Sequence, residues 1–415
     1  MRLVDAHGLP RVAVTGMGAV SCVGTGTSAL LDALRTRRHG LRTMDAFAAL
    51  GMRGKVGGPL DEAALPPEPP RKLRRFLPAP ALYAWHAANE ALAQAGLAPE
   101  RLAEADCGLV LGGGAALSEH EEALENHRAR GIAKLSPFLV PRGMSSAMSA
   151  GLAQAYGIGG SSYTISSACT SGAHAIGHAL ELIQLGRQNV VLAGGAEELH
   201  PSTAMWFDVM GALSPQADPA QASRPFHRGR DGFALAAGAG VLVLESLEHA
   251  LARGATVLAE LAGYGSATDA ASMVGPGAGG IARALRQALD RAGTLPDYVN
   301  AHACGTQGDL AEWQAIRTVF AERGTSLPPI SSIKGLIGHA PGAAGALDAI
   351  ACLLMLEHGF LAAGAPLDDI DSDFAGAPLL TTNHEQRTDA VLSSSYGFGG
   401  SCAALLFRRF DKATA

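Results

Sequence analysis

The chemistry of this sequence centres on one cysteine, Cys169, at the predicted junction of a strand and a helix. Tyr163-Thr164-Ile165 is β-branched and aromatic, as strands are, and the small and apolar residues from Ala168 to Leu185 fit a helix that is buried on most sides. A thiol at a helix N-terminus faces unpaired backbone N–H groups and the positive end of the helix dipole. We therefore predict a nucleophilic thiol whose pKa is lowered towards neutrality, and N–H groups that stabilise an oxyanion.

Two histidines elsewhere in the chain are candidates to complete such a site. His302 follows the strand-like residues Tyr298 and Val299, and His339 lies in a glycine-flanked loop before a predicted helix, Gly342 to His358. Imidazole is suited to proton transfer and hydrogen bonding beside a nucleophilic cysteine. The alternative is structural: a buried cysteine commonly acts as a small hydrophobic residue, and either histidine alone fits a packed core.

Longer segments of the chain favour the catalytic interpretation. They read TISSACTSGAH, AEELHPSTAMWFDVMGALS, RPFHRGRDGFALAAGAGVLVLE, KGLIGHAPGAAG and SSSYGFGGSCAALLF. Together they resemble the β-ketoacyl-acyl-carrier-protein synthases, in the elongating branch whose site is Cys-His-His, and the resemblance runs from Val12 to Phe407. An Ala-Ala-Gly run between Asp231 and Gly240 makes the sequence more similar to synthase I than to synthase II.

The resemblance implies a thiolase fold of the α/β class, in which two βαβα halves form five layers, α-β-α-β-α. The predicted elements agree, because strands and helices alternate up to Glu245 and the pattern starts again at Val257. We predict an N-terminal half, residues 1–255, that carries the nucleophilic cysteine, and a C-terminal half, residues 256–415, that carries both catalytic histidines. The resemblance also implies a dimer, and an active site between the halves.

The resemblance further implies a decarboxylative Claisen condensation. Cys169 would take an acyl chain from an acyl-carrier-protein thioester, and malonyl carrier protein would then lose carbon dioxide. The resulting enolate would attack the acyl-cysteine and extend the chain by two carbons. His302 and His339 would stabilise the enolate as neutral imidazoles that donate through Nε2.

Other residues of the predicted site follow from the same resemblance. Lys334 would set the electrostatics of the pocket together with Glu312. The backbone N–H of Phe398 would be the second oxyanion donor, and its ring would gate the acyl pocket between the flexible Gly397 and Gly399. A generic glycine-rich loop is the alternative for this segment.

Two positions bear on substrate binding. The family usually reads His-Gly-Thr-x-Thr-x-x-Gly-Asp, whereas this chain reads HACGTQGD from His302 to Asp309, one residue shorter. Cys304 stands where the first pantetheine-binding threonine is expected, which leaves Thr306 for that role and argues against a standard housekeeping enzyme. Ala115 falls where the family places a side chain at the end of the acyl tunnel near the dimer interface, and its methyl group leaves room for the chain.

The charge balance restricts the partners. Charged residues make up 17 % of the chain and the net charge is −6, which gives no reason to expect nucleic-acid binding and favours extensive burial, including a subunit interface. An acyl carrier protein is small and acidic, so it needs a local basic face. The residues that fall at or within one residue of the family's docking positions are Lys72, Arg75, Arg130 and Lys134. A solvated run of charges is the alternative.

The cysteines and the apolar runs indicate the compartment. The six cysteines show no CxxC spacing, which is typical of a reduced, intracellular protein. The longest apolar run, Ala349 to Leu356, is too short to span a membrane. We expect a cytoplasmic protein without a bound metal or cofactor, whose substrates are carried on the phosphopantetheine of acyl carrier protein.

Three alternative functions share features of this sequence. A Cys-His hydrolase or acyltransferase fits the same side chains, although no G-x-S-x-G elbow supports a serine version. A non-catalytic chain-length subunit of a polyketide or polyene synthase would lack the nucleophile, and Cys169 is present. An active synthase that pairs with such a subunit, as a heterodimer in place of a homodimer, is compatible with the sequence.

Overall fold

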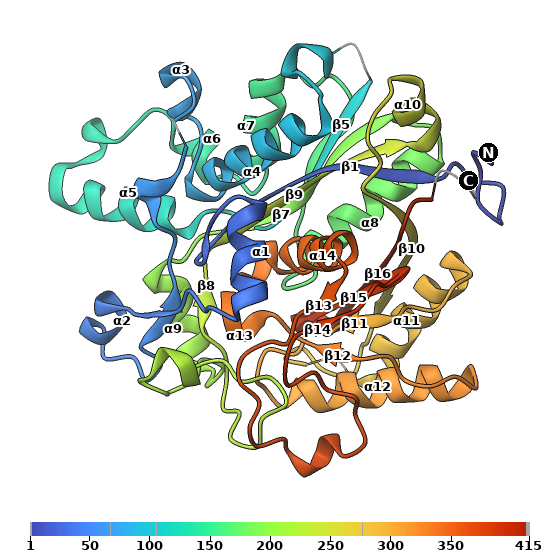
Figure 1. Cartoon of the computed structure of the whole chain (residues 1–415). Coiled ribbons are helices and arrows are strands. Elements are labelled where there is room, and N and C mark those ends of the chain that lie inside the picture. The colour runs from blue at the N-terminus through green and yellow to red at the C-terminus, as the bar shows by residue number, and fades with distance from the viewer. Residues whose placement is uncertain (1, 67, 104–105, 276, 412–415) are drawn as a thin grey trace.

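The computed structural model describes residues 2–66, 68–103, 106–275 and 277–411 (Figure 1). Its main sheet has eleven strands in the order β12-β11-β15-β16-β10-β1-β9-β7-β5-β6, with β2 paired to β1. These strands are β1 Val12–Ser21, β2 Gly24–Thr25, β5 Cys107–Gly112, β6 Ser162–Ile165, β7 Val190–Glu197, β9 Gly238–Ser246, β10 Ala259–Thr268, β11 Tyr298–Asn300, β12 Ile330–Ser331, β15 Ala390–Gly397 and β16 Ser401–Arg408. Two smaller sheets contain β3 Arg42–Thr43, β4 Val56–Gly58 and β8 Leu235–Ala236, and β13 Phe360–Leu361 with β14 His384–Glu385.

The main sheet consists of two sets of strands with the same topology. Across the sheet, the first set runs β6-β5-β7-β9-β1 and the second runs β12-β11-β15-β16-β10. When the strands of each set are counted in chain order, both sets read third, second, fourth, fifth, first. In both sets the third, second and fourth strands are parallel and the fifth is antiparallel to both neighbours. The two first strands, β1 and β10, join the sets in an antiparallel pair with Val12 opposite Leu261. This repeat is the duplication that the order of predicted elements indicated; the boundary at residue 255 stays a prediction.

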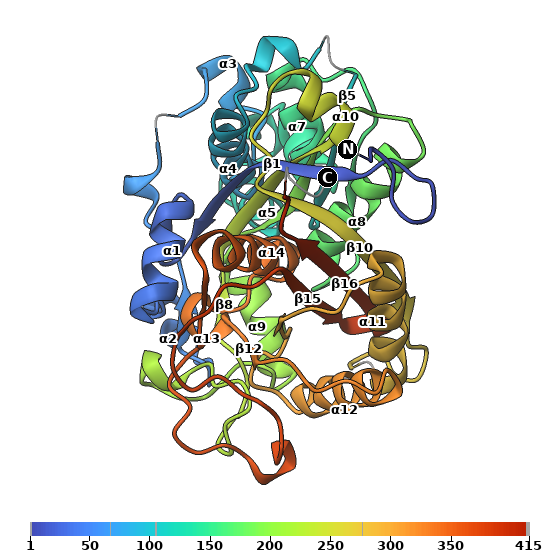
Figure 2. The same ribbon diagram turned by 45° about the vertical axis from the view of Figure 1, so that its right-hand side comes forward.

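Helices form the other three layers. The outer pairs are α4 Ala79–Ala95 with α7 Ala147–Tyr156 on the first set, and α11 Ala278–Ala292 with α12 Gly308–Glu322 on the second (Figure 2). Between the sets lie α8 Ser171–Gln184 and α14 Pro341–His358, which contact each other. The thiolase-type arrangement α-β-α-β-α is therefore confirmed. The remaining helices are α1 Thr27–Thr36, α2 Asp45–Ala49, α3 Arg71–Arg74, α5 Leu117–Arg130, α6 Leu139–Gly143, α9 Pro201–Val209, α10 Leu247–Ala252 and α13 Lys334–Ile337.

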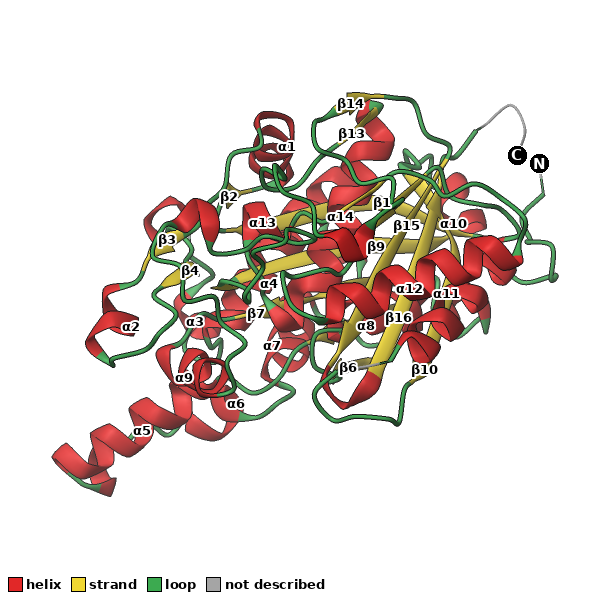
Figure 3. Cartoon of the chain, turned by 90° about the horizontal axis from the view of Figure 1, so that it is seen from below, coloured by secondary structure: helices red, strands yellow, loops and turns green. Residues whose placement is uncertain are grey.

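Helix α5 had no counterpart among the elements predicted from the sequence. It projects from the body of the molecule (Figure 3), and Glu119 is its one buried residue. A helix without an apolar face gives no hydrophobic periodicity, which is the main signal of an amphipathic helix.

The two central helices approach closely because small residues face each other. An ideal Cβ on Gly345 would lie 2.6 Å from the backbone nitrogen of Ala173, and one on Gly172 would lie 3.1 Å from the carbonyl oxygen of Gly342. The second contact joins the first turns of the two helices. The residues that precede α8 and α14 are therefore held at one place, between the two sets of strands.

The close approach of α8 and α14 can be tested by substitution of a glycine. Replacing a glycine inside a helix by alanine normally stabilises the helix by about 1 kcal/mol. At position 345 the new methyl group would collide with backbone, so we expect Gly345→Ala to destabilise the protein by about 1–3 kcal/mol. Chemical denaturation would measure the change. Gly279→Ala is the matched control, because Gly279 lies on an exposed position of α11 and its ideal Cβ would meet only side-chain atoms, at 3.7 and 3.8 Å; an equal or stabilising effect at position 345 would contradict the close crossing.

Candidate active site

Cys169 lies in a tight turn between β6 and α8. Ala168, just before it, has φ 53°, a left-handed conformation that is uncommon for a residue with a Cβ atom. The hydroxyl of Ser171 holds this turn: it accepts the N–H of Ser167 at 2.9 Å and donates to the carbonyl of Ala168 at 2.6 Å. Helix α8 begins two residues after the cysteine. The strand, turn and helix predicted around the thiol are thus present.

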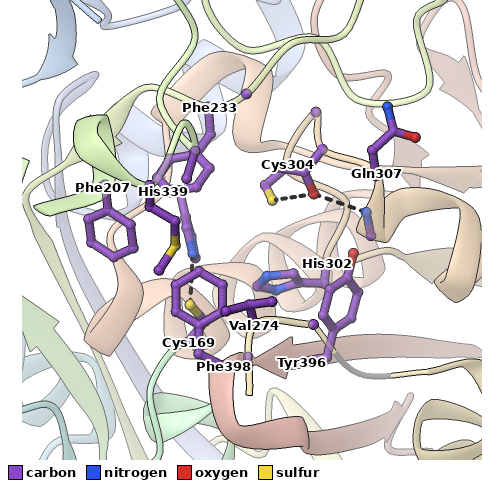
Figure 4. A pocket seen from close by; sticks show the side chains of 18 of the residues that line it. Cys169, Phe207, Phe233, Val274, His302, Cys304, Gln307, His339, Tyr396 and Phe398 are labelled. Atoms are coloured by element: carbon purple, nitrogen blue, oxygen red, sulfur yellow. Dashed lines mark hydrogen bonds between the residues drawn. The ribbon is translucent and has the colours of Figure 1, made fainter. Parts of the chain in front are cut away.

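The structure brings Cys169, His302 and His339 together, as predicted (Figure 4). His339 Nε2 lies 3.1 Å from Cys169 Sγ, and the two imidazole rings are nearly perpendicular, with centroids 5.2 Å apart. His302 follows β11, whereas His339 stands two residues before α14. Cys169 stands two residues before α8, so the contact between the two central helices accounts for the contact between the thiol and His339.

Burial controls the protonation of the thiol. It raises the pKa of Cys169 to about 12, and the Glu197 carboxylate adds to this, while the Lys334 ammonium and the backbone N–H groups of Cys169 and Phe398 lower it. The prediction of a thiol near neutrality is therefore wrong, because the cost of burying a thiolate exceeds the effect of the helix N-terminus. The same two N–H groups are the pair predicted to form the oxyanion hole, and both act on the sulfur.

Burial also keeps both imidazoles neutral. It lowers the pKa of His302 and of His339 well below the usual value, and the nearby Lys334 ammonium lowers both further. Within the described part of the chain, neither Nδ1 atom has a hydrogen-bond partner. Each Nε2 is therefore free to carry the ring proton and to donate a hydrogen bond into the site.

Lys334 forms an ion pair with a residue that the sequence analysis did not name. Its ammonium donates to Asp348 Oδ2 at 2.7 Å, and both side chains are 1 % exposed, whereas the sequence analysis grouped Lys334 with Glu312. Asp348 was missed by sequence reasoning. Its signal was available, because it is the one charged residue in the interior of the apolar segment PGAAGALDAIACLLML. A buried carboxylate in such a helix requires a cationic partner.

Two carboxylates from the start of α12 hold the loop after β11. Glu312 accepts the N–H groups of His302 and Ala303 at 2.8 and 2.9 Å, and burial raises its pKa to about 7. Asp309 accepts the N–H groups of the next three residues of the loop, Cys304, Gly305 and Thr306. The loop that is one residue shorter than the family pattern is thus fixed through its backbone, and Glu312 positions His302 without contacting its ring.

A cavity of about 680 Å³ connects the three residues to the surface. Its lining includes the apolar side chains Phe207, Phe233, Val274, Tyr396 and Phe398, and the polar side chains Arg230, Asp231, Thr306 and Gln307. The Phe398 ring is half-buried, with its centroid 6.1 Å from that of Phe207. A Cβ on Gly397 would lie 2.8 Å from the backbone nitrogen of Cys169, so only glycine fits there.

Comparisons with known proteins match both parts of the chain. The N-terminal domain of β-ketoacyl synthases matches residues 10–250, and the C-terminal domain of β-ketoacyl synthases matches residues 258–368. The chain belongs to the β-ketoacyl synthase family. This confirms the family predicted from the motifs, and with it the class of acyltransferase.

The synthase has similar relatives along its whole length. It is 40 % identical to the 3-oxoacyl-[acyl-carrier-protein] synthase 1 of Haemophilus influenzae and to that of Escherichia coli K12, over 97 % of this chain and 99 % of each relative. A β-ketoacyl synthase from Burkholderia phymatum STM815 is 35 % identical, with a TM-score of 0.90 over 97 % of this chain and 100 % of that one. The ishigamide ketosynthase/chain length factor is 32 % identical, with a TM-score of 0.88 and the same coverage. The similarity to synthase I agrees with the sequence analysis.

The remaining residues predicted to bind substrate or carrier protein lie in or near the cavity, between β5 and α5, and on the surface. Thr306 and Gly397 line the cavity; Gly399 is exposed and donates its N–H to the carbonyl of Met273 at 2.8 Å. Ala115 is half-buried between β5 and α5, outside the described lining of the cavity. All four predicted docking residues are exposed.

Two of the docking residues meet in a separate cavity. Arg75 and Lys134 both line a hollow of about 280 Å³ beside α5. The Arg75 guanidinium lies 4.9 Å from the ring centroids of both Phe76 and Phe138. Such stacking orders this side chain, so Arg75 also has a packing role.

The ligand atoms of Cys169, His302 and His339 lie within 4.8 Å of one another, a spacing that suits a metal ion. However, the Lys334 ammonium lowers the pKa of all three groups, and a positive charge that does so also opposes a bound cation. A metal-free site stays our prediction. Among the described residues, no helix is both long and apolar enough to cross a lipid bilayer.

The pKa of Cys169 yields a kinetic test. Below its pKa, the thiolate fraction of a thiol rises about tenfold per pH unit. We expect the rate at which iodoacetamide alkylates Cys169, followed by mass spectrometry of its peptide, to rise without a plateau between about pH 7 and 9. The double variant Lys334→Met with Asp348→Leu should react more slowly, because the ammonium that lowers the pKa is gone. Lys55→Met, at an exposed lysine, is the control. A plateau near neutrality would contradict this account.

Proposed function

We propose that the synthase extends an acyl chain by two carbons through decarboxylative Claisen condensation. The observation that carries this proposal is the position of Cys169 Sγ, 3.1 Å from His339 Nε2 and within the influence of the N–H groups of Cys169 and Phe398, in a cavity of about 680 Å³. A thiol, two neutral imidazoles and two N–H donors are what the steps of this reaction require.

In the first step, Cys169 Sγ attacks the thioester carbonyl of an acyl carrier protein. The developing oxyanion accepts hydrogen bonds from the N–H groups of Cys169 and Phe398. The bond to the pantetheine sulfur then breaks, and this sulfur takes the proton that the cysteine gives up. His339 Nε2 lies 3.1 Å from Sγ and relays that proton while the ring carries its own proton on Nδ1; the ring proton moves to Nε2 before the second step. The step needs no free thiolate, which agrees with the high pKa of the buried thiol.

In the second step, a malonyl thioester loses carbon dioxide. The electrons of the broken carbon–carbon bond form an enolate, whose oxygen accepts hydrogen bonds from Nε2 of His302 and His339. The enolate carbon attacks the acyl-cysteine carbonyl, the bond between this carbonyl and Sγ of Cys169 breaks, and Sγ takes up a proton from solvent water to restore the thiol. Neutral imidazoles suit this role because they donate without attracting the malonyl carboxylate as cations would. Burial keeps both imidazoles neutral, and Lys334, fixed by its pairing with Asp348, adds to this effect.

The direct test is the fate of an acyl group. Wild-type synthase incubated with acyl carrier protein that bears a labelled acyl chain should gain the label on the Cys169 peptide. Cys169→Ala should gain none while it keeps its fold, since alanine suits a buried position of this size. Cys304→Ala is the control, because Cys304 is the other cysteine that lines the cavity. Full labelling of Cys169→Ala would refute the proposal.

The histidine variants should separate the two steps. We expect His302→Ala to acylate Cys169 at the wild-type rate, because the His302 ring does not contact the sulfur, and to lose malonyl decarboxylation by roughly 100-fold or more, the usual effect of removing one oxyanion donor. His339→Ala should slow both steps. Single-turnover acylation and release of labelled carbon dioxide measure them separately. A His302→Ala variant that fails to acylate would overturn this division of roles.

We propose an acyl carrier protein as the partner, with its phosphopantetheine entering the cavity past Thr306. A neighbouring structure supports this: the ketosynthase AntDE, described with its type II polyketide acyl-carrier protein AntF, is 29 % identical and superposes with a TM-score of 0.84 over 97 % of this chain and 100 % of that chain. The acidic carrier would meet Lys72, Arg75, Arg130 and Lys134. We propose that the synthase works in the cytoplasm, as a dimer, without a cofactor. The ishigamide neighbour favours a ketosynthase/chain-length-factor pair as the alternative to a homodimer.

The docking face yields a test that spares the active site. Because Arg75 packs on two rings, we choose Lys72→Glu with Lys134→Glu. Charges at an interface rim act mainly on the encounter rate and are screened beyond ~8 Å at physiological salt. The double variant should raise the apparent KM for carrier-bound substrates several-fold and leave turnover of free pantetheine thioesters unchanged. Equal losses on both kinds of substrate would refute the docking proposal. The chain-length role of Ala115 and the division at residue 255 also stay predictions.

A further inference from the structure

A second polar cavity, here called the rear cavity, has a volume of about 430 Å³. Three segments form it: the end of β1 with β2, the loop between α1 and β3, and the residues around Asp61. Its described lining shares no residue with that of the cavity at Cys169. Neither the family assignment nor the proposed reaction gives it a role.

The described lining of the rear cavity holds more basic than acidic side chains. Arg38, His39 and Arg42 line it, against one acidic residue, Asp61. The Arg38 guanidinium donates to the carbonyl of Val23 and to a carboxylate oxygen of Asp32, both at 3.2 Å. Arg42 makes one long contact, 3.5 Å to the carbonyl of Pro59, and in the described structure no carboxylate pairs with it. Its planar fork of donors is therefore available to an anion.

Two polar side chains of the lining lack partners. Ser21 is 3 % exposed, and its hydroxyl has no hydrogen-bond partner within the described chain. The same holds for Nδ1 of His39. Buried polar atoms are nearly always hydrogen-bonded, so two such atoms beside one cavity call for an explanation. A ligand with several acceptor oxygens would satisfy both.

Cys22, which lines the rear cavity, lies within the electrostatic influence of both guanidinium groups. Burial raises the pKa of Cys22 to about 12, but the guanidinium groups of Arg42 and Arg38 both lower it, so their charges act at the thiol. The protonated thiol donates to the carbonyl of Ile337 at 3.3 Å, and the N–H of Gly40 donates to the carbonyl of Leu336 at 2.9 Å. The rear cavity is thus hydrogen-bonded to α13, the helix that begins at Lys334 and leads to His339.

We propose that the rear cavity binds a small phosphorylated ligand, a phosphomonoester or a diphosphate. Two guanidinium groups, an imidazole and a hydroxyl suit phosphate oxygens, and the volume falls in the range of small-molecule sites. The bound ligand would also stabilise α13, because the two hydrogen bonds that α13 accepts from this region are donated by Cys22 and Gly40, which line the rear cavity. This proposal is independent of the proposed condensation.

Calorimetric titration of the full chain with pyrophosphate tests the proposal. We expect saturable binding, weakened about tenfold or more in Arg42→Gln, since charged hydrogen bonds to phosphate are lost. Ser21→Ala is a second variant, which removes a hydroxyl without changing charge and should also weaken binding. Arg35→Gln is the matched control, because Arg35 lies on the neighbouring α1, outside the described lining, and pairs with Glu385. Parallel titrations with adenosine monophosphate and inorganic phosphate distinguish a phosphomonoester from a diphosphate or free phosphate.

A second experiment distinguishes binding at this site from binding at the catalytic site. Wild-type protein alkylated at Cys169 should bind pyrophosphate as tightly as untreated protein, because the two cavities have separate linings. No saturable binding to the wild type, an equal loss in Arg35→Gln, or loss on alkylation of Cys169 would each overturn the proposal. None of these results depends on whether the synthase condenses acyl chains.

Discussion

The contact between the first turns of α8 and α14 is the constraint on which the site depends. Each central helix is preceded, two residues earlier, by a reactive side chain: Cys169 before α8 and His339 before α14. The two sets of strands have the same topology, so the two helices approach this contact from equivalent places in each set. Gly172 and Gly345 let the backbones meet. A larger side chain at either position would move the thiol away from the imidazole.

Burial decides the charge state of the site. A helix N-terminus favours a thiolate, but at Cys169 the loss of water outweighs it, and the same effect keeps His302 and His339 neutral. Three neutral reactive groups beside one buried ion pair form a site in which little charge exists until substrate arrives. The Lys334–Asp348 pair is the fixed charge of this region. Such a pair contributes little net stability, because the cost of removing two ions from water offsets much of their attraction. Its contribution is to hold the positive charge of Lys334 at a fixed position near the two imidazoles.

The sequence predicted the fold class, the duplication and the meeting of Cys169 with both histidines, because each lies next to a strand or helix end that the motifs mark. It also named the N–H of Phe398 as an oxyanion donor, a role that stays a prediction; in the structure this N–H lowers the pKa of Cys169. It did not predict the partner of Lys334, since that depends on how α13 packs against α14, nor the direction of the thiol pKa, since burial is a property of the whole fold. Helix α5 was missed because its surface is polar all round. Local sequence patterns thus predicted which reactive groups meet, whereas the pKa values of these groups depend on packing between distant parts of the chain.

The pairing of β1 has a consequence for how the chain is made. All ten residues of this strand, VAVTGMGAVS, are buried, and its long partners are β9 and β10, which begin at Gly238 and Ala259. On a ribosome that adds about 5–20 residues per second, the first strand emerges about 10 seconds before β9 at the fastest rate and about 40 seconds before it at the slowest. During that time an apolar segment of high β-propensity has no sheet to join. Once β9 has paired, the edge of β1 that faces β10 stays open until Ala259 and the residues after it are made, so the join that unites the finished molecule is, in the nascent chain, an unpaired strand edge that other chains could pair with.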